Sequence, residues 1–333
     1  MTINVAINGF GRIGRNVLRA IVEGGRNDIR VVAINDLGPV ETNAHLLRFD
    51  SVHGRFPGEV TVQGDCMDLG YGPIRVTAER DPSALPWDGV DVAMECTGIF
   101  TARDRAAAHL ANGSSRVLVS APADGADKTI VFGVNDETLG DEDVVVSNAS
   151  CTTNCLSPVA KVLNDAIGIN KGIMTTIHSF TGDQPTLDTM HKDLYRGRAA
   201  ASSMIPTSTG AAKAVGLVLP ELSGRLDGFA IRVPTPNVSV VDLVFESARP
   251  TTAEEVNAAI IAAADGPMRG ILGYTDAKNV SIDFNHDSRS SVFHLDQTKV
   301  LDGNMVRILS WYDNEWGFSN RMADAAVVMG RLQ

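Results

Sequence analysis

A hexapeptide near the middle of the chain has residue types that could form a covalent intermediate: Ser150-Cys151-Thr152-Thr153-Asn154-Cys155. It follows a hydrophobic, strand-like run at 144–147 and leads into a helix-like segment at 152–166. A cysteine at a helix N-terminus lies near unpaired backbone N–H groups and the positive end of the helix dipole, which favour its thiolate. Because most free cysteines are small buried hydrophobic residues, the hypothesis of a nucleophile needs support from other parts of the chain.

A glycine-rich turn near the N-terminus has the spacing of a dinucleotide-binding motif, Gly9-Phe10-Gly11-Arg12-Ile13-Gly14. A short hydrophobic run precedes it, helical periodicity follows, and a second hydrophobic run ends at Asp36, 22 positions after Gly14. In such motifs Gly9 permits the tight turn, Gly11 lets a pyrophosphate approach the backbone, and Gly14 lets helix and strand pack closely. Asp36 would bond the ribose hydroxyls and repel a 2′-phosphate, so NAD is favoured over NADP.

Other cofactor candidates follow hydrophobic strand-like runs. Thr97 and Gly98 follow the run at 90–95, and Ser120 follows the run at 117–119. Ligands of open parallel sheets collect beyond the carboxyl ends of the strands. We therefore expect these residues either to contact the cofactor or to be ordinary strand-end residues.

A nucleophilic cysteine needs a base, and His178 is the candidate among the seven histidines. It lies in a long strand-like run at 169–180, where alternate residues such as Thr176 and His178 would share one face. With a dinucleotide nearby, Cys151 could attack an aldehyde, and hydride transfer to a nicotinamide would leave a thioester.

Two later segments have patterns that suit a binding site. The segment 181–206 is long, polar and without clear periodicity, which is typical of a functional loop or of one packed against a partner. Thr209 and Gly210 precede a helix-like segment at 211–219, where hydroxyl and N–H groups would suit a phosphate. Plain N-capping is the alternative interpretation.

The order of the elements predicts two domains of different class. Strands and helices alternate in the first half, whereas later strands follow one another without helices between them. We expect an α/β Rossmann-type dinucleotide-binding domain at 1–150 and an α+β catalytic domain with a mixed or antiparallel sheet at 151–314. The patterns also predict a helix at 101–111 and a strand at 280–284. Because of Pro158, they predict that the 152–166 helix is kinked or starts differently.

Bulk composition excludes several classes of protein. The formal net charge of −11 argues against broad binding to nucleic acid or to anionic membranes. The four cysteines lack C-x-x-C spacing, so no metal site is predicted. We see neither a signal-peptide pattern nor a hydrophobic run of membrane-spanning length, and a cytoplasmic location is the default expectation.

Four sequence blocks, in the right order over the whole chain, resemble those of phosphorylating glyceraldehyde-3-phosphate dehydrogenase. They are Asn8-Gly9-Phe10-Gly11-Arg12-Ile13-Gly14-Arg15, the hexapeptide around Cys151, His191-Lys192-Asp193-Leu194, and Trp311-Tyr312-Asp313-Asn314-Glu315-Trp316. The resemblance implies reversible oxidative phosphorylation of D-glyceraldehyde 3-phosphate to 1,3-bisphosphoglycerate. It also implies a homotetramer in which the loop 181–206 packs near a neighbour's cofactor. The last helix, at about 315–333, would pack back on the cofactor domain.

The resemblance also implies roles for individual residues. Cys151 would be the nucleophile and His178 the base. The attacking inorganic phosphate would be held by Ser150, Thr152, Thr209 and Gly210. The phosphate of the substrate would be surrounded by Thr181, Asp183, Arg196 and Arg232. The cofactor positions are Arg12, Ile13, Asp36, Arg80, Ser120 and Asn314, in addition to Gly9, Gly11, Gly14, Thr97 and Gly98.

Three questions stay open at this level. Asp188-Thr189-Met190-His191 stands where NAD-specific members of the family tend to have Leu-Pro before the histidine, so NADP remains an option. A role in glycolysis and one in carbon fixation by the Calvin cycle both fit. Two alternative functions are an erythrose-4-phosphate dehydrogenase, which hydrolyses its thioester, and a cofactor-binding redox sensor without turnover.

Overall fold

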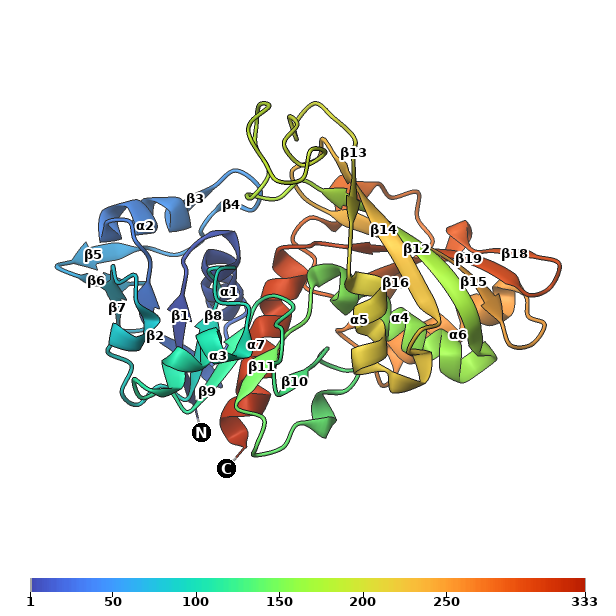
Figure 1. Ribbon diagram of the computed structural model, residues 1–333. Coiled ribbons are helices and arrows are strands. Elements are labelled where there is room, and N and C mark those ends of the chain that lie inside the picture. The colour runs from blue at the N-terminus through green and yellow to red at the C-terminus, as the bar shows by residue number, and fades with distance from the viewer. Residues whose placement is uncertain (1, 333) are drawn as a thin grey trace. The chain divides into compact units, whose positions relative to one another are not determined.

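The structure, a computed structural model, describes residues 2–332 (Figure 1). These residues divide into two compact units. Unit 1 comprises residues 2–132, 136–149 and 319–332, and unit 2 comprises residues 133–135 and 150–318.

Unit 1 is built on a mostly parallel sheet. Only its last two strand pairs, β5–β6 and β6–β7, are antiparallel among the pairs of this sheet that the structure describes. Its strands, in spatial order, are β10 (Lys128–Thr129), β11 (Val145–Ser147), β9 (Arg116–Val119), β8 (Val92–Glu95), β1 (Ile3–Asn8), β2 (Ile29–Asn35), β7 (Pro73–Thr77), β6 (Cys66–Asp68) and β5 (Thr61–Gln63). A separate hairpin joins β3 (Phe49–Asp50) and β4 (Gly54–Arg55).

The order of these strands creates a switch point at β1. The chain runs from β1 outward to β2 and β7, then returns to place β8 on the other side of β1. Most residues of β1 and β8 are hydrophobic, and nearly all are buried, as expected for strands in the middle of a parallel sheet. Ligands of such sheets bind beyond the carboxyl ends of the strands at this point.

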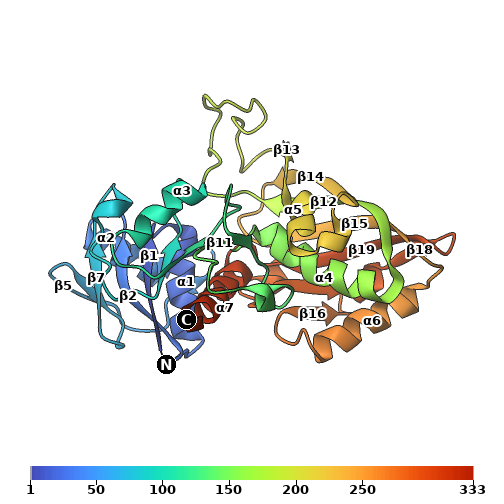
Figure 2. The same ribbon diagram turned by 60° about the horizontal axis from the view of Figure 1, so that its bottom comes forward.

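The helices of unit 1 are α1 (Arg12–Glu23), α2 (Val40–Arg48), the short α3 (Arg103–Ala106) and most of α7 (Trp316–Arg331). α1 buries Val17, Leu18 and Ile21 on one face. α7 joins this unit through an ion pair of Asp324 with Arg26, at the end of α1, and both views show the two helices as neighbours (Figures 1 and 2).

Unit 2 is built on a mixed sheet. In spatial order its strands are β13 (Ile205–Ser208), β14 (Leu226–Val233), β12 (Ile169–Ser179), β15 (Ser239–Ser247), β19 (Met305–Tyr312), β17 (Ser291–His294) and β16 (Leu272–Thr275), and β18 (Lys299–Leu301) also pairs with β19. The pairs β12–β14 and β16–β17 are parallel and the others are antiparallel. The parallel sheet of unit 1 and the mixed sheet of unit 2 confirm the predicted fold class.

Three helices belong to unit 2: α4 (Cys151–Ile167), α5 (Ala211–Val218) and α6 (Ala253–Asp265). α4 contacts both α5 and α6 and packs against β12, β15, β17 and β19, so it covers one face of the sheet (Figures 1 and 2). The opposite face exposes Ile173, Phe229 and Val244.

Two local predictions need correction. The segment predicted as a strand at 280–284 is wrong, because Ser281–Phe284 is a 3₁₀-helix. The predicted helix at 101–111 is shorter and ends as the 3₁₀-helix Ala107–Leu110. The helix after Cys151 starts at Cys151 and continues past Pro158 to Ile167.

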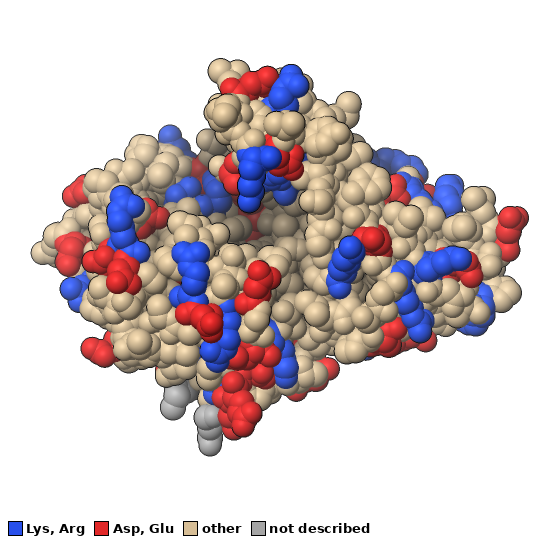
Figure 3. All heavy atoms as spheres, viewed as in Figure 1, with Lys and Arg blue, Asp and Glu red and all other residues tan. Residues whose placement is uncertain are grey.

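The surface shows no dominant sign of charge on the face in Figure 3, where acidic and basic side chains are interspersed. Among residues 2–332, no helix combines the length and the hydrophobicity needed to cross a membrane.

Gly14 and Gly11 make a matched pair for a test of the glycine-rich turn. A Cβ at Gly14 would lie 2.1 Å from the carbonyl oxygen of Gly9, whereas one at Gly11 would have no atom within 4 Å. We expect Gly14→Ala to lower the free energy of unfolding by about 3 kcal/mol or more, because backbone must move. Gly11→Ala, at an N-cap, should cost about 1 kcal/mol or less. Urea unfolding without cofactor measures both, and equal losses would contradict this account.

Candidate active site

Cys151 is the first residue of α4. The preceding residue, Ser150, is the N-cap, and its Oγ accepts a hydrogen bond from the backbone N–H of Thr153 at 3.1 Å. Ser150 has an extended backbone, so the chain turns sharply into the helix and the thiol of Cys151 is left partly exposed. The local sequence therefore places a thiol beside the unpaired N–H groups of a helix start.

His178 reaches Cys151 from β12. Alternate residues of this strand, Met174, Thr176 and His178, are buried. The Nε2 atom of His178 lies 3.5 Å from the Sγ atom of Cys151. Its Nδ1 atom lies 2.7 Å from the carbonyl oxygen of Ser179, which can only accept. We therefore assign the proton to Nδ1, and the lone pair of Nε2 faces the thiol.

Arg232 lies on the other side of the imidazole. Strand β14 pairs with β12 in a register that puts Arg232 opposite His178. Its Nη1 atom donates to the carbonyl oxygen of Ser179 at 3.0 Å and to the hydroxyl of Thr181 at 3.1 Å. The same atom is 3.0 Å from Nδ1 of His178. This places a positive charge next to the ring.

Burial and this charge set the protonation states. Burial, followed by the charge of Arg232, lowers the pKa of His178 to about 3. Burial raises the pKa of Cys151, and Arg232 offsets part of that rise. Both shifts thus oppose the charged forms of the pair, the thiolate and the imidazolium. Burial acts against the thiolate that the helix N-terminus favours.

The four residues predicted to surround a substrate phosphate lie together. Arg196 forms an ion pair with Asp183, and the hydroxyl of Thr181 donates to the same carboxylate. Arg232 contacts Thr181, which links the group to His178. Burial would raise the pKa of Asp183, but the bond from Thr181 and the charge of Arg196 lower it overall.

Of the four residues predicted to hold inorganic phosphate, three lie at two helix starts. The Thr153 hydroxyl contacts Ser150 at 2.8 Å and donates to the carbonyl of Ala211, the first residue of α5, at 3.4 Å. Thr209 accepts from the N–H of Ala211 at 3.2 Å, and Gly210 is the N-cap of α5. The starts of α4 and α5 are thus neighbours, which suits an anion.

Thr152, the fourth of these residues, is buried and turned inward. Its hydroxyl lies 2.8 Å from that of Tyr312, which also lies 2.8 Å from the hydroxyl of Thr176. The edge of the Tyr312 ring packs on the ring of His178, with centroids 5.9 Å apart. Sequence reasoning missed Tyr312 as a site residue, although alternation along β19 predicts that it faces inward with Ser310.

Asn314 is held in one orientation by two serines. Its Oδ1 atom accepts from the hydroxyls of Ser179 and Ser239, both at 2.8 Å. Asp313 caps the start of α7 by accepting from the N–H groups of Glu315 and Trp316. With Oδ1 fixed in this way, the Nδ2 atom is the donor of the Asn314 amide.

The cofactor candidates of unit 1 gather around a hollow of about 430 Å³ at the carboxyl ends of β1, β2 and β8. Its lining includes Gly9, Gly11, Asp36, Arg80 and Thr97. Gly9 has a φ of 91°, and the protein itself leaves open the space that a Cβ on Gly11 would fill. A glycine with free space above it fits the close approach of a pyrophosphate.

Asp36 and Arg12 have partners within unit 1. The Oδ2 atom of Asp36 accepts from the N–H of Phe10 at 2.7 Å, so the carboxylate also holds the glycine-rich turn. Arg12 forms a bidentate ion pair with Asp50. Burial would raise the pKa of Asp50, but the bond from Arg12 helps to lower it to about 2.

Some cofactor candidates do not line this hollow. They are Arg12, Ile13, Gly14, Gly98 and Ser120. The hydroxyl of Ser120 bonds to the thiol of Cys96 instead. Asn314 belongs to unit 2.

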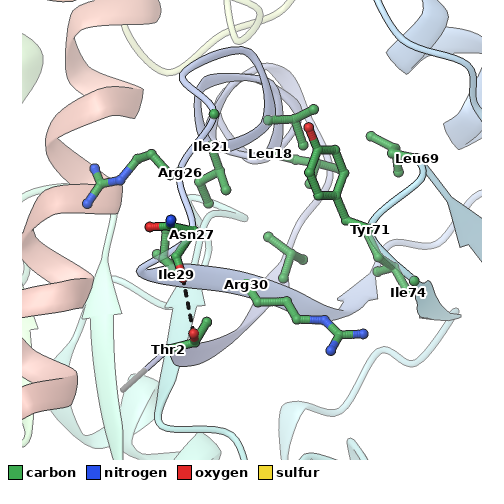
Figure 4. Close-up of a pocket in the computed structure, with 14 residues that line it drawn as sticks. Thr2, Leu18, Ile21, Arg26, Asn27, Ile29, Arg30, Leu69, Tyr71 and Ile74 are labelled. Atoms are coloured by element: carbon green, nitrogen blue, oxygen red, sulfur yellow. Dashed lines mark hydrogen bonds between the residues drawn. The ribbon is translucent and has the colours of Figure 1, made fainter.

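A second hollow of unit 1, of about 240 Å³, has a different character. It lies between α1, β2 and the turn before β7, and it is lined mainly by hydrophobic side chains (Figure 4). The guanidinium groups of Arg26 and Arg30 point away from Leu18, Ile21 and Ile29 in this view. None of the predicted site residues lines it.

The remaining cysteines show no sign of a catalytic role. All four cysteines are free, and Cys155 is fully buried with contacts to Ser291 and Ser310. Burial raises the pKa of Cys155 to about 12. Within residues 2–332, no group of three or more His, Cys, Asp or Glu side chains could hold a metal ion.

Comparisons with known proteins match the chain along its full length. Residues 3–103 match the family model for the NAD binding domain of glyceraldehyde 3-phosphate dehydrogenase, and residues 150–314 match the model for its C-terminal domain. The chain is 80% identical over 332 residues to a glyceraldehyde-3-phosphate dehydrogenase of Cereibacter sphaeroides, with full coverage of both proteins. The chain belongs to the glyceraldehyde-3-phosphate dehydrogenase family.

Other members of the family are similar over the same length. Glyceraldehyde-3-phosphate dehydrogenase of Xanthobacter flavus is 75% identical over 334 residues, and the chromosomal form of Cupriavidus necator is 60% identical over 337 residues. Both comparisons cover all of each protein. The family's NAD binding domain includes the hollow beside Gly11, so NAD is the cofactor indicated.

Arg232 should control the protonation of both members of the Cys–His pair. Its charge favours the thiolate of Cys151 and opposes protonation of His178, so Arg232→Ala should raise both pKa values. The rate of Cys151 alkylation by iodoacetamide, followed against pH, should show a midpoint at higher pH than in the parent. Arg232→Lys keeps the charge and serves as the control. An unchanged or lower midpoint in Arg232→Ala would contradict this assignment.

Proposed function

We propose that this protein catalyses the reversible oxidative phosphorylation of D-glyceraldehyde 3-phosphate to 1,3-bisphosphoglycerate. The observation that supports this most directly is the 3.5 Å approach of Nε2 of His178 to Sγ of Cys151, beside two arginines. It is supported by the family of the chain and by its full-length relatives of that name.

The Cys151–His178 pair can perform nucleophilic catalysis with His178 as the base. As Cys151 attacks the aldehyde carbon, its proton passes to Nε2 of His178, whose Nδ1–H is held by Ser179. His178 gives this proton to the aldehyde oxygen, which yields the thiohemiacetal, and takes the hydroxyl proton again as the hydride leaves, which yields the thioester. NAD supplies the hydride acceptor when bound. Attack by inorganic phosphate on the thioester releases the acyl phosphate, and the departing thiolate of Cys151 recovers its proton from His178.

Each of the two groups of anion-binding residues binds one of the two phosphates. Arg196 and Arg232, with Thr181 and Asp183, take the phosphate of the substrate, since guanidinium groups bind phosphate oxygens in pairs. Ser150, Thr209 and Gly210 take the inorganic phosphate at the neighbouring starts of α4 and α5. Thr152 can contribute its backbone N–H, because its side chain bonds to Tyr312.

The proposed cofactor site consists of the glycine-rich turn and the residues around it, together with Asn314. Gly9, Gly11 and Gly14 accommodate the pyrophosphate, and Asp36 bonds the ribose of NAD. Arg12, Ile13, Arg80, Thr97, Gly98 and Ser120 complete the site in unit 1. Asn314 donates from Nδ2 to the carboxamide of the nicotinamide. Because Thr189 and Met190 replace a Leu-Pro pair, use of NADP besides NAD is part of the proposal.

Two alternatives make different demands on the site. An erythrose-4-phosphate dehydrogenase would need no inorganic phosphate site, yet the starts of α4 and α5 provide one. A redox sensor without turnover would have no use for the cluster of Arg196 and Arg232. Both observations favour the phosphorylating enzyme.

Reduced cofactor formed from glyceraldehyde 3-phosphate, followed by absorbance, tests the proposal. We expect reduction that depends on inorganic phosphate, with a higher kcat/KM for NAD than for NADP because of Asp36. Cys151→Ser should abolish it while Cys155→Ser, at a buried thiol outside the chemistry, retains it. Turnover without phosphate would favour the erythrose-4-phosphate enzyme, and no reduction with either cofactor would favour the sensor.

We also propose a homotetramer. The face of the second sheet opposite α4 exposes Ile173, Phe229 and Val244 on adjacent strands, and Ile173 pairs directly with Val244. The loop 181–206 exposes Leu187 and Met190, which are 77% and 98% accessible. Exposed hydrophobic side chains in such numbers are typical of surfaces that contact another subunit.

Light scattering should give a mass of four chains of 35.4 kDa each. The double variant Ile173→Lys/Val244→Lys should give a smaller assembly, because two charges would be buried in the contact. Lysine at the exposed Leu217, on α5, is the matched control and should leave the mass unchanged. A parent protein that elutes and scatters as a monomer would refute the tetramer.

A cytoplasmic location completes the proposal, since all four cysteines are free thiols. Recovery of the protein from a membrane or secreted fraction would contradict it.

A further inference from the structure

Polar side chains, three of them buried and that of Thr77 half-buried, connect the carboxyl ends of four neighbouring strands in unit 1. Glu95 ends β8, Asn8 ends β1, Asn35 ends β2 and Thr77 ends β7. Asn8 Nδ2 donates to Glu95 Oε2 at 2.7 Å, and Asn35 Nδ2 donates to Asn8 Oδ1 at 2.8 Å. The hydroxyl of Thr77 donates to Asn35 Oδ1 at 2.8 Å. We call these four residues the strand-end relay.

Glu95 is the acceptor at one end of the relay. Besides Asn8, its Oε2 atom lies 2.9 Å from Nε2 of His109, a fully buried ring stacked on Trp87. Its Oε1 atom accepts from the backbone N–H of Thr97 at 2.9 Å and from the Thr97 hydroxyl. Three donors thus converge on a side chain that is 1% exposed, and Nε2 of His109 is a fourth in the tautomer that carries its proton there. The two side-chain oxygens of Glu95 accept from all of them.

The opposite end of the relay fixes its direction. The backbone N–H of Glu79 donates to Asn35 Oδ1 at 2.8 Å, and Asn35 Nδ2 also donates to the carbonyl of Glu79. A backbone N–H can only donate, so Asn35 cannot turn its amide over without facing a donor with a donor. Asn8 is then fixed between Asn35 and Glu95. Every bond of the relay points toward Glu95.

Two residues of the relay form part of the floor of the cofactor hollow. Asn8, Asn35, Glu79 and Thr97 line that hollow, and Glu95 lies directly behind them. The glycine-rich turn rests on the same structure, because a Cβ on Gly9 would lie 2.7 Å from the backbone nitrogen of Thr97. The position of Thr97, which Glu95 holds by two bonds, therefore sets the position of the turn.

We propose that Glu95 is a positioning residue for NAD, which acts through the strand-end relay to fix the turn of Gly9, Thr97 and the Glu79 backbone around the cofactor. Glu95 does not touch the cofactor itself. The inference rests on the proposed use of NAD. It adds Glu95, which the glycine-rich motif alone does not indicate, to the residues that support NAD binding.

Replacement of Glu95 by glutamine tests the relay with almost no change in shape. The NH₂ group of the new glutamine faces the Nδ2 group of Asn8 and Nε2 of His109. Rotation of the Asn8 amide would only move the donor–donor contact to Asn35, and rotation of the Asn35 amide would move it to the N–H of Glu79. The floor of the hollow must therefore move to relieve a donor–donor contact. We expect the Kd for NAD, measured by calorimetry on the purified full chain, to rise roughly tenfold or more.

Matched variants separate positioning from general loss of stability. Ser114→Ala removes a buried hydrogen bond of unit 1 outside the hollow, from Ser114 to the carbonyl of Arg116 at 2.7 Å. It should lower Tm and leave the Kd for NAD within twofold of the parent. Thr97→Val removes one donor to Glu95 and should weaken NAD binding severalfold even if Glu95→Gln fails to fold. Thr97→Ser keeps that donor and should restore parent affinity.

Alkylation of Cys151 by iodoacetamide without NAD should proceed at the parent rate in all four variants, because Cys151 belongs to unit 2. Parent affinity for NAD in both Glu95→Gln and Thr97→Val would overturn the inference. The inference would also be overturned if Ser114→Ala had the same Tm as Glu95→Gln and lost as much affinity for NAD. A parent protein that binds no NAD would instead refute the proposed cofactor, and the inference with it.

Discussion

The close approach of a neutral imidazole to a helix-terminal thiol is the constraint on which the candidate active site depends. Two features of the packing create it. Helix α4 lies across the sheet with Cys151 at its start, and strand β12 directs His178 toward that start. The parallel register with β14 then adds the charge of Arg232 on the far side of the ring. Burial and this charge both oppose an imidazolium, so they keep the pKa of His178 low.

Unit 1 depends on backbone geometry rather than on reactive side chains. Gly9 takes a φ that other residues rarely adopt, and Gly14 leaves no room for a Cβ against the Gly9 carbonyl. Gly11 faces open space, so the packing of the protein does not require its small size. Asp36 holds the same turn through the N–H of Phe10, which couples a cofactor candidate to the shape of the loop.

Secondary-structure prediction from local sequence patterns was wrong where the pattern extended over only a few residues. The segment 280–284 has the hydrophobic composition of a strand, but Asp283 accepts from the N–H of Val280 and closes a turn. Phe284 then packs on Trp311, with ring centroids 5.2 Å apart. A contact with a distant residue decided this conformation, which a period-two pattern over five residues cannot reveal.

The sequence by itself determined the class of each unit, the glycine-rich turn and the start of α4 at the cysteine motif, because these depend on short-range spacing and backbone freedom. Only the tertiary structure decided that Cys151 and His178 lie within 3.5 Å of each other, that Thr152 turns inward to Tyr312, and that Glu95 ends the relay. Each of these depends on desolvation or on hydrogen bonds between residues far apart in the chain. Their energies exist only once the strands are in register, and so no local pattern encodes them.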